Sequence, residues 1–124
     1  MTVLDLAPLE AGLLSARVLL EGQRLRVALL GEAGLPEQDA LEGFLDRIFG
    51  AAREFPIEEV EMDFRHLEFM NSSCLAVFVA WIDRVRESEP SYRIRFLASE
   101  AQPWQRRSLR AFQAIARDVV VLDA

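Results

Sequence analysis

The sequence predicts an α/β fold, with a mixed sheet of four to five strands and helices packed on one face. Apolar residues alternate with polar ones over several short stretches, and they repeat at helical spacing over three longer stretches. In the second half of the chain the two patterns follow each other in turn. With 124 residues, 52% of them hydrophobic, and no stretch resembling a linker, residues 1–124 are expected to form a single domain.

The first predicted elements are two strands joined as an antiparallel hairpin. Residues 14–20 and 23–30 both alternate, and the turn-forming pair Glu21-Gly22 lies between them. Gly31 and Gly34 follow and are expected to end the second strand. The hairpin therefore supplies the antiparallel part of the sheet.

A first helix is predicted between two prolines. The periodicity changes at Pro36, and Pro56 ends the helical pattern. One face of this helix is apolar and should be buried. It consists of Leu41, Phe44, Leu45, Ile48, Phe49, Ala52 and Phe55.

The remaining predicted elements are strands and helices in alternation. In order, they are a strand over residues 57–65, a helix over 72–87, a strand over 92–98, a helix from Pro103 and a strand over 119–122. Strands separated by helices pair in parallel through right-handed crossovers. The sequence thus predicts parallel pairing after the hairpin.

Charged residues on the predicted strands indicate that one face of the sheet is exposed to water. A strand covered on both faces would be apolar throughout, whereas here charges occupy every second position. Acidic and basic rows on neighbouring strands would form cross-strand pairs worth about 0.2 to 1 kcal/mol each. These rows are Glu59, Glu61 and Asp63, then Arg93 and Arg95, with Arg24 and Arg26 able to extend them. All helices should pack on the other face.

The junction between the strand over 57–65 and the helix over 72–87 has the features of a helix start. Asn71 is a favourable N-cap residue, because its side-chain oxygen accepts a hydrogen bond from the first turn. Ser72 then occupies the first helical position. Two adjacent hydroxyls, those of Ser72 and Ser73, are therefore expected at a helix N-terminus.

Composition excludes several classes of function. A net charge of −6 disfavours general nucleic-acid binding, which requires a basic surface. No apolar run is long enough to span a bilayer, and no secretory signal is recognisable, so a soluble cytoplasmic protein is expected. One Cys and one His allow neither an internal disulfide nor a structural metal site. No metal and no cofactor are expected.

The residues around this junction resemble those of STAS domains, whose best-studied members are bacterial anti-sigma-factor antagonists. In that family an apolar strand ends in Asp, and Asp-Ser-Ser-Gly-Leu or Asp-Ser-Thr-Gly-Leu then opens an apolar helix. This chain has Val60-Glu61-Met62-Asp63, followed by Asn71-Ser72-Ser73-Cys74-Leu75. Leu30-Gly31-Glu32 also resembles the end of the family's second strand. The close match covers residues 57–96.

The resemblance implies a non-enzymatic signalling module that regulates transcription by partner switching. Its partner would be an anti-sigma factor, a kinase-like ATPase or a phosphatase, and its phosphoacceptor would be Ser72, or less favourably Ser73. Two positions depart from the family pattern, because Asn71 replaces Asp and Cys74 replaces Gly. They leave open an alternative, a divergent STAS scaffold or homodimerising domain that is not phosphorylated.

The second helix has an apolar face wider than a single buried stripe needs. Cys74, Val77 and Trp81 lie to one side of the main stripe. The predicted partner-binding residues are therefore Asn71, Ser72, Ser73, Cys74, Val77 and Trp81. The alternative is that the third helix or the N-terminal segment covers Trp81.

Cys74 and Asp63 are further candidates for a chemical role. Cys74 near a helix N-terminus could be a nucleophile, but the only His, His66, is not placed with it, so a buried inert thiol is favoured and no catalytic residue is predicted. Asp63 is interpreted as structural.

On the third helix the predicted buried stripe is Trp104, Ser108, Ala111, Phe112 and Ile115, which leaves Arg106, Arg107 and Arg110 solvated.

Overall fold

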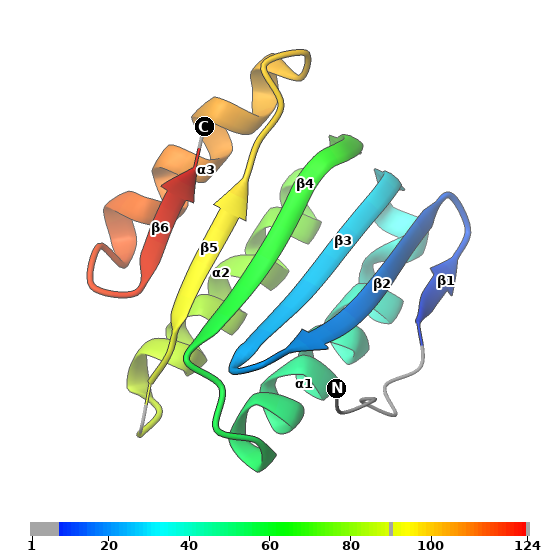
Figure 1. Cartoon of the computed structure of the whole chain (residues 1–124). Helices are drawn as coiled ribbons and strands as arrows, with labels where there is room; N and C mark the ends of the chain where they lie inside the picture. The colour runs from blue at the N-terminus through cyan, green and yellow to red at the C-terminus, as the bar shows by residue number, and fades with distance from the viewer. Residues whose placement is uncertain (1–7, 90, 124) are drawn as a thin grey trace.

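A computed structural model describes residues 8–89 and 91–123, which form a sheet covered by helices (Figure 1). The sheet has six strands in the order β1-β2-β3-β4-β5-β6. The elements are β1 (Leu9–Ala11), β2 (Leu14–Glu21), β3 (Arg24–Ala33), a 3₁₀ turn (Leu35–Glu37), α1 (Gln38–Glu54), β4 (Glu59–Met70), α2 (Ser72–Glu87), β5 (Arg93–Leu97), α3 (Pro103–Ile115) and β6 (Val120–Asp123).

The topology is the mixed one expected from the sequence. Strands β1, β2 and β3 pair antiparallel, whereas β3, β4, β5 and β6 pair in parallel. All three α-helices lie on the same side of the sheet, as Figure 1 shows. The expected four to five strands were too few, because β1 has only 3 residues and is too short to show alternation.

The hairpin is confirmed, but its second strand continues past the glycine expected to end it. Gly31 lies within β3 at a positive φ of 95°. A Cβ atom at this position would lie 2.0 Å from the carbonyl oxygen of Leu13, so only glycine fits. The pairing of β3 with β4 shifts register directly after Gly31, where β4 has one residue more than β3.

Strand β4 is also longer than expected. The sequence pattern ended at Arg65, whereas the strand runs to Met70 and pairs there with Ala33 of β3. The alternation after Arg65 is broken because register shifts place two residues of β4 opposite one of β3. The junction with α2 is therefore held by strand pairing, and no loose connection precedes it.

The core between sheet and helices contains a group of interlocking aromatic rings. Phe64 of β4 contacts Phe78 of α2 and Phe96 of β5, with 5.3 Å between ring centroids in each pair. Phe112 of α3 lies 5.4 Å from Phe96. Edge-to-face pairs at these distances contribute about 0.5 to 1.5 kcal/mol beyond burial alone. The rings thus connect the sheet to α2 and α3.

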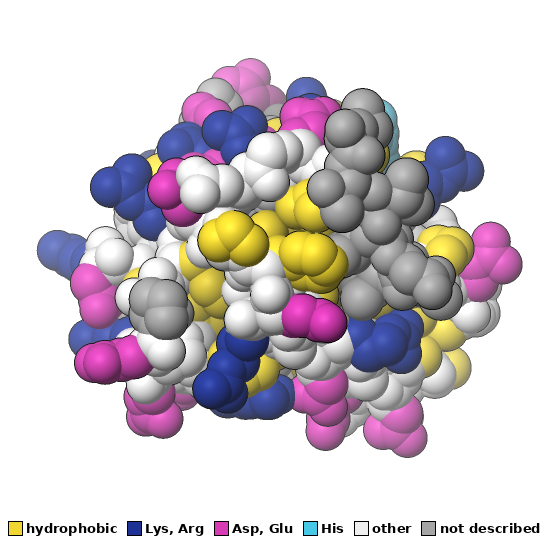
Figure 2. Space-filling model, turned by 60° about the horizontal axis from the view of Figure 1, so that its bottom comes forward, with side chains coloured by type: hydrophobic (Ala, Val, Ile, Leu, Met, Phe, Trp, Pro, Cys, Tyr) yellow, Lys and Arg dark blue, Asp and Glu magenta, His cyan; other side chains and the backbone are white. Residues whose placement is uncertain are grey.

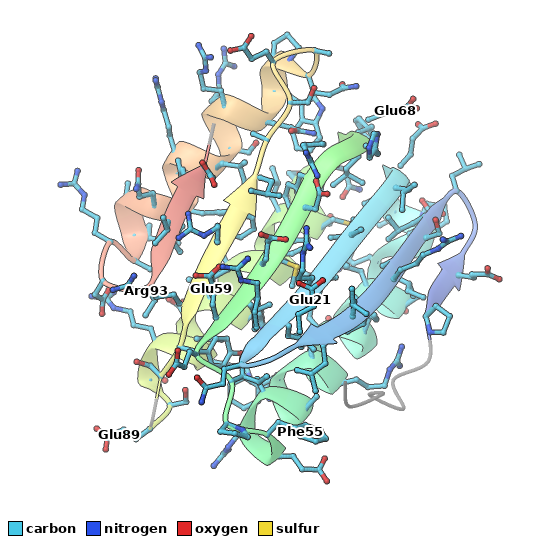
Figure 3. The ribbon with its side chains drawn as sticks, in the orientation of Figure 1. Glu21, Phe55, Glu59, Glu68, Glu89 and Arg93 are labelled. Carbon is cyan, nitrogen blue, oxygen red and sulfur yellow. The ribbon has the colours of Figure 1, made fainter. Side chains whose placement is uncertain are left out.

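The uncovered face of the sheet carries the charged rows expected from the sequence. Glu59 lies on this face, as Figure 3 shows, and Arg95 and Arg24 bind its carboxylate at 3.0 and 3.3 Å. Arg26 binds Glu61 at 2.7 Å. Arg93 has no ion pair within the described residues, although it is paired with Glu59 in the strand register. These pairs explain how an uncovered sheet face is tolerated.

The surface at the end of the molecule opposite the N-terminus of α2 has no patch of a single charge sign. Figure 2 shows acidic and basic side chains mixed there around a small apolar centre. Pro56, Ile57 and Val119 line a shallow pocket at this end. No helix in the described part of the chain is long and apolar enough to cross a membrane.

Candidate functional site

The N-terminus of α2 is capped as the sequence predicted. Asn71 has an extended backbone, with φ of −78° and ψ of 171°, and its Oδ1 accepts a hydrogen bond from the backbone N–H of Cys74 at 2.9 Å. The N–H of Leu75 bonds to the carbonyl oxygen of Asn71 at 3.0 Å. Capping of this kind satisfies donors that have no partner within the helix. The first turn of α2 therefore has a fixed geometry.

Ser72 is the first residue of α2, and its side chain is exposed, whereas that of Ser73 is half-buried. The first turn of α2 contains no acidic residue. Within the described residues, the backbone N–H groups of Ser72 and Ser73 have no hydrogen-bond partner. Free N–H groups at a helix N-terminus favour added negative charge, although the carboxylate of Glu37, outside this helix, is close enough for its charge to act on Cys74.

Two contacts fix this helix start to the end of β3. The N–H of Asn71 donates to the carbonyl oxygen of Ala33 at 2.9 Å. The thiol of Cys74 donates to the carbonyl oxygen of Gly34 at 3.5 Å. The end of β4, the end of β3 and the following 3₁₀ turn are thus joined at this point, which holds Ser72 in one position.

Exposed apolar side chains lie on the segments that meet at this end of the sheet, and sequence reasoning missed them. Leu35 is 70% exposed and Phe69 is 47% exposed. Phe69 precedes Ser72 by three residues, and its ring lies near Gly34, which Cys74 contacts. Leu13, 67% exposed, is joined to this region because its carbonyl oxygen accepts from the N–H of Glu32 at 3.0 Å. We call Leu13, Leu35 and Phe69 the apolar border.

The prediction that Cys74, Val77 and Trp81 offer a free apolar face on α2 is wrong, because all three side chains are buried within the chain. Cys74 is 0%, Trp81 is 2% and Val77 is 9% exposed. The N-terminal segment, one of the two alternatives for covering Trp81, lies for residues 1–7 outside the described part of the chain. Instead Leu45 and Asp46 of α1 lie beside Trp81, where they line the same shallow groove.

This groove between α1 and α2 begins beside Ser73 of the candidate site. It encloses about 370 Å³, and Ser73 and Val77 line it together with Trp81. Val77 and Trp81 therefore form part of its floor but offer little free surface. Exposed surface at this site comes from Ser72 and the apolar border.

Cys74 lacks the properties of a reactive thiol. Burial, with a smaller contribution from the charge of Glu37, raises the pKa of its thiol. A raised pKa disfavours the thiolate, which is the nucleophilic form. His66 is exposed on β4 and has no described hydrogen bond to Cys74. The inward direction of the Cys74 side chain also means that it does not obstruct a partner at Ser72.

Asp63 is a structural carboxylate, as the sequence analysis favoured. It accepts hydrogen bonds from the backbone N–H of Arg65 at 3.0 Å and from its guanidinium at 2.9 Å. Burial alone would raise the pKa of Asp63, but these hydrogen bonds outweigh it and lower the pKa. Within the described residues, no group of three His, Cys, Asp or Glu side chains could hold a metal ion.

The buried stripe observed on α3 is rotated around the helix relative to the stripe predicted from the sequence. The buried residues are Gln105, Leu109 and Phe112, whereas Ala111 is exposed and Ile115 is 43% exposed. Trp104 and Ser108 are half-buried, and Arg106, Arg107 and Arg110 are exposed as predicted.

Gln105 explains this rotation. Its Nε2 donates to the carbonyl oxygens of Phe64 at 2.6 Å and Leu67 at 2.8 Å, and its Oε1 accepts from the N–H of Ser99 at 2.9 Å. A buried amide with all these partners is satisfied. Its acceptors belong to β4, far away in sequence, so no local pattern indicates that a polar residue turns inward.

Comparison with known proteins finds similarity in structure alone. Neither family models nor curated sequences give a match. An anti-sigma factor antagonist from Mycobacterium paratuberculosis has a TM-score of 0.67 and 16% identity, with 88% of this chain and 84% of that chain covered. The anti-sigma factor antagonist SpoIIAA in its unphosphorylated form has a TM-score of 0.55 and 21% identity, with 88% of each chain covered.

These likenesses confirm the resemblance stated from the sequence at the level of the fold. The chain has the STAS-like α/β fold of anti-sigma-factor antagonists, with a mixed sheet and helices on one face. The strand count is slightly higher than expected from the sequence.

Proposed function

We propose that this protein is a non-enzymatic signalling module that binds an anti-sigma factor or a kinase-like ATPase and is released when Ser72 is phosphorylated. The observation that carries the proposal is the exposed side chain of Ser72 at the capped N-terminus of α2. The fold shared with anti-sigma factor antagonists supports the same class of partner. The raised pKa of Cys74 is consistent with a binding protein rather than a thiol enzyme.

A phosphate on Ser72 would change the charge of the surface with little effect on the fold. It adds a charge of about −1.5 to −2, and the helix dipole stabilises negative charge at this position by about 0.3 to 1 kcal/mol. The first turn has no acidic residue that would oppose it. The modified domain should therefore remain folded.

The phosphate would instead lower the affinity of the partner. The apolar border supplies exposed surface of the kind that a protein partner buries. Closing an interface over Ser72 buries the phosphate, and a buried charge without a matching cation is costly. A loss of about 3 kcal/mol weakens binding roughly a hundredfold. Interface electrostatics alone would thus give a two-state signal.

The second candidate is a divergent STAS scaffold, or a homodimerising domain, that works without phosphorylation. It is favoured by Asn71 and Cys74, which occupy positions where the family pattern has Asp and Gly. In the structure Asn71 caps α2 and Cys74 points inward, so both substitutions are compatible with the fold. What they would affect is recognition by a kinase.

Incubation with a kinase-type anti-sigma factor and ATP, followed by intact-mass measurement, separates the two candidates. We expect one added phosphate, lost in Ser72→Ala and retained in Ser91→Ala, because Ser91 is an exposed serine outside the site. A Ser73→Ala variant should also retain it. Stable binding of that partner with no added mass would favour the second candidate instead.

We further propose a cytoplasmic location, since the expected partner acts on transcription. We expect neither a nucleic acid nor a membrane among its partners. The net charge of −6 supports the first of these exclusions.

A further inference from the structure

A cavity between α3 and strands β5 and β6 plays no part in the function proposed above. It encloses about 520 Å³, which is within the range of small-molecule sites. Its accessible apolar lining comes from Ala98, which follows β5, from Leu122 of β6 and from Pro103 of α3, above the buried side chains of Phe96 and Leu109. Figure 1 shows α3 passing behind these two strands. The exposed residues Pro103, Arg106 and Arg110, in the first half of that helix, line its solvent-facing side.

Two arginines line the same cavity. Arg106 and Arg110 are four residues apart on α3, so their side chains lie on one side of the helix. Neither takes part in an ion pair within the described residues. Six other arginines do form ion pairs, whereas Arg93 and several further arginines, like these two, form none within the described residues.

Acidic groups at the cavity do not cancel this charge. Asp123 lines it, but its carboxylate binds Arg95 at 3.5 Å on the uncovered face. Glu100 is exposed and has no ion pair within the part of the chain described. Two unpaired guanidiniums against one unpaired carboxylate leave the opening positive, on a chain whose net charge is −6.

From this arrangement we infer that the cavity binds a single-chain amphiphile, with its hydrocarbon chain against Ala98, Pro103 and Leu122 and its anionic head group on Arg106 and Arg110. Apolar walls favour the hydrocarbon chain through burial. Guanidinium groups bind a carboxylate or a phosphate through two parallel hydrogen bonds. The inference does not depend on phosphorylation of Ser72.

The test is calorimetric titration of the full chain with dodecanoate and with dodecyl phosphate, each below the concentration at which micelles form. We expect saturable binding at one site, with the preferred head group showing whether a carboxylate or a phosphate is the natural one. Dodecanol should bind at least about tenfold more weakly, because it lacks the charge. Dodecyltrimethylammonium should not bind.

Variants locate the site. Arg106→Gln with Arg110→Gln should weaken binding of the preferred anion by at least about tenfold, whereas Arg107→Gln, on the same helix but outside the cavity, should leave it unchanged. Ala98→Phe should fill the cavity and abolish binding, with circular dichroism as the check of folding.

The inference is overturned if neither anion gives saturable binding, if dodecanol binds as tightly, or if the Arg107→Gln variant loses as much affinity as the double variant. The arginine variants alter exposed side chains and should fold, so these outcomes remain decisive even if Ala98→Phe does not fold.

Discussion

Asn71 accepts a hydrogen bond from the backbone N–H of Cys74 at 2.9 Å, and this contact sets the start of α2. Removing the acceptor in Asn71→Ala should lower the free energy of unfolding by about 1 kcal/mol. Asn71→Asp should retain the stability, since Asp caps equally well and its charge is favourable at a helix N-terminus. Urea denaturation of the three proteins measures the difference. Equal stability of the alanine variant would mean that the cap is not formed in solution.

The apolar border should contribute to partner binding and little to folding. Phe69 is 47% exposed, so Phe69→Ala should change stability by less than about 0.5 kcal/mol. Because exposed aromatic residues are often binding hot spots, we expect the affinity for a kinase-type anti-sigma factor to fall about tenfold or more. Ile115→Ala is the matched control, since Ile115 is 43% exposed on α3. Equal affinity of the Phe69 variant and the control would place the interface elsewhere.

Gln105 connects α3 to the strand that leads to the candidate site. Gln105→Leu would leave the carbonyl oxygens of Phe64 and Leu67 without their donor inside the core, and we expect a loss of about 2 to 4 kcal/mol in unfolding free energy. Gln113→Leu on the same helix is the control and should change stability by less than about 0.5 kcal/mol. Thermal and urea denaturation would measure both. A Gln105 variant as stable as the control would contradict the assignment.

The pair formed by Asp63 and Arg65 should make stability depend on acidic pH. The pKa of Asp63 is lowered in the folded protein, so its contribution is present above the ordinary pKa of about 3.9 and is lost as pH falls through the folded value. Asp63→Asn should therefore be less stable than the parent at neutral pH, by about 1 kcal/mol. The difference should shrink below about pH 4.

Denaturation of both proteins between pH 7 and pH 3 tests this dependence. Arg65→Gln serves as the partner variant, because it removes the two guanidinium hydrogen bonds but keeps the backbone one. It should lose part of the same stability at neutral pH. A gap between parent and Asp63→Asn that widens on acidification would show the opposite sign and reject the explanation.

Most of the fold could be predicted because its signals are local. The helix over residues 72–87 was predicted with its observed bounds, since the Asn71 cap and the apolar periodicity both lie within it. The hairpin and the charged rows were equally clear from alternation. The missing strand β1 and the extended end of β4 were not predictable in this way, because pairing with neighbouring strands defines them.

The candidate site was predicted only in part, for the same reason. The positions of Asn71 and Ser72 follow from capping rules and were correct. The burial of Trp81 depends on how α1 packs against α2, and the exposure of Leu35 and Phe69 depends on where the ends of β3 and β4 meet. These are tertiary relationships, and a single sequence does not display them.

The most direct test of the central claim is the dissociation constant of a kinase-type anti-sigma factor with this protein before and after phosphorylation of Ser72. Ser72→Asp and Ser72→Ala provide the matched pair that adds or withholds charge at the same position. The account predicts that phosphorylation weakens binding about a hundredfold, that Ser72→Asp weakens it in the same direction, and that Ser72→Ala binds as the parent does. Affinities that stay equal across all four proteins would contradict it.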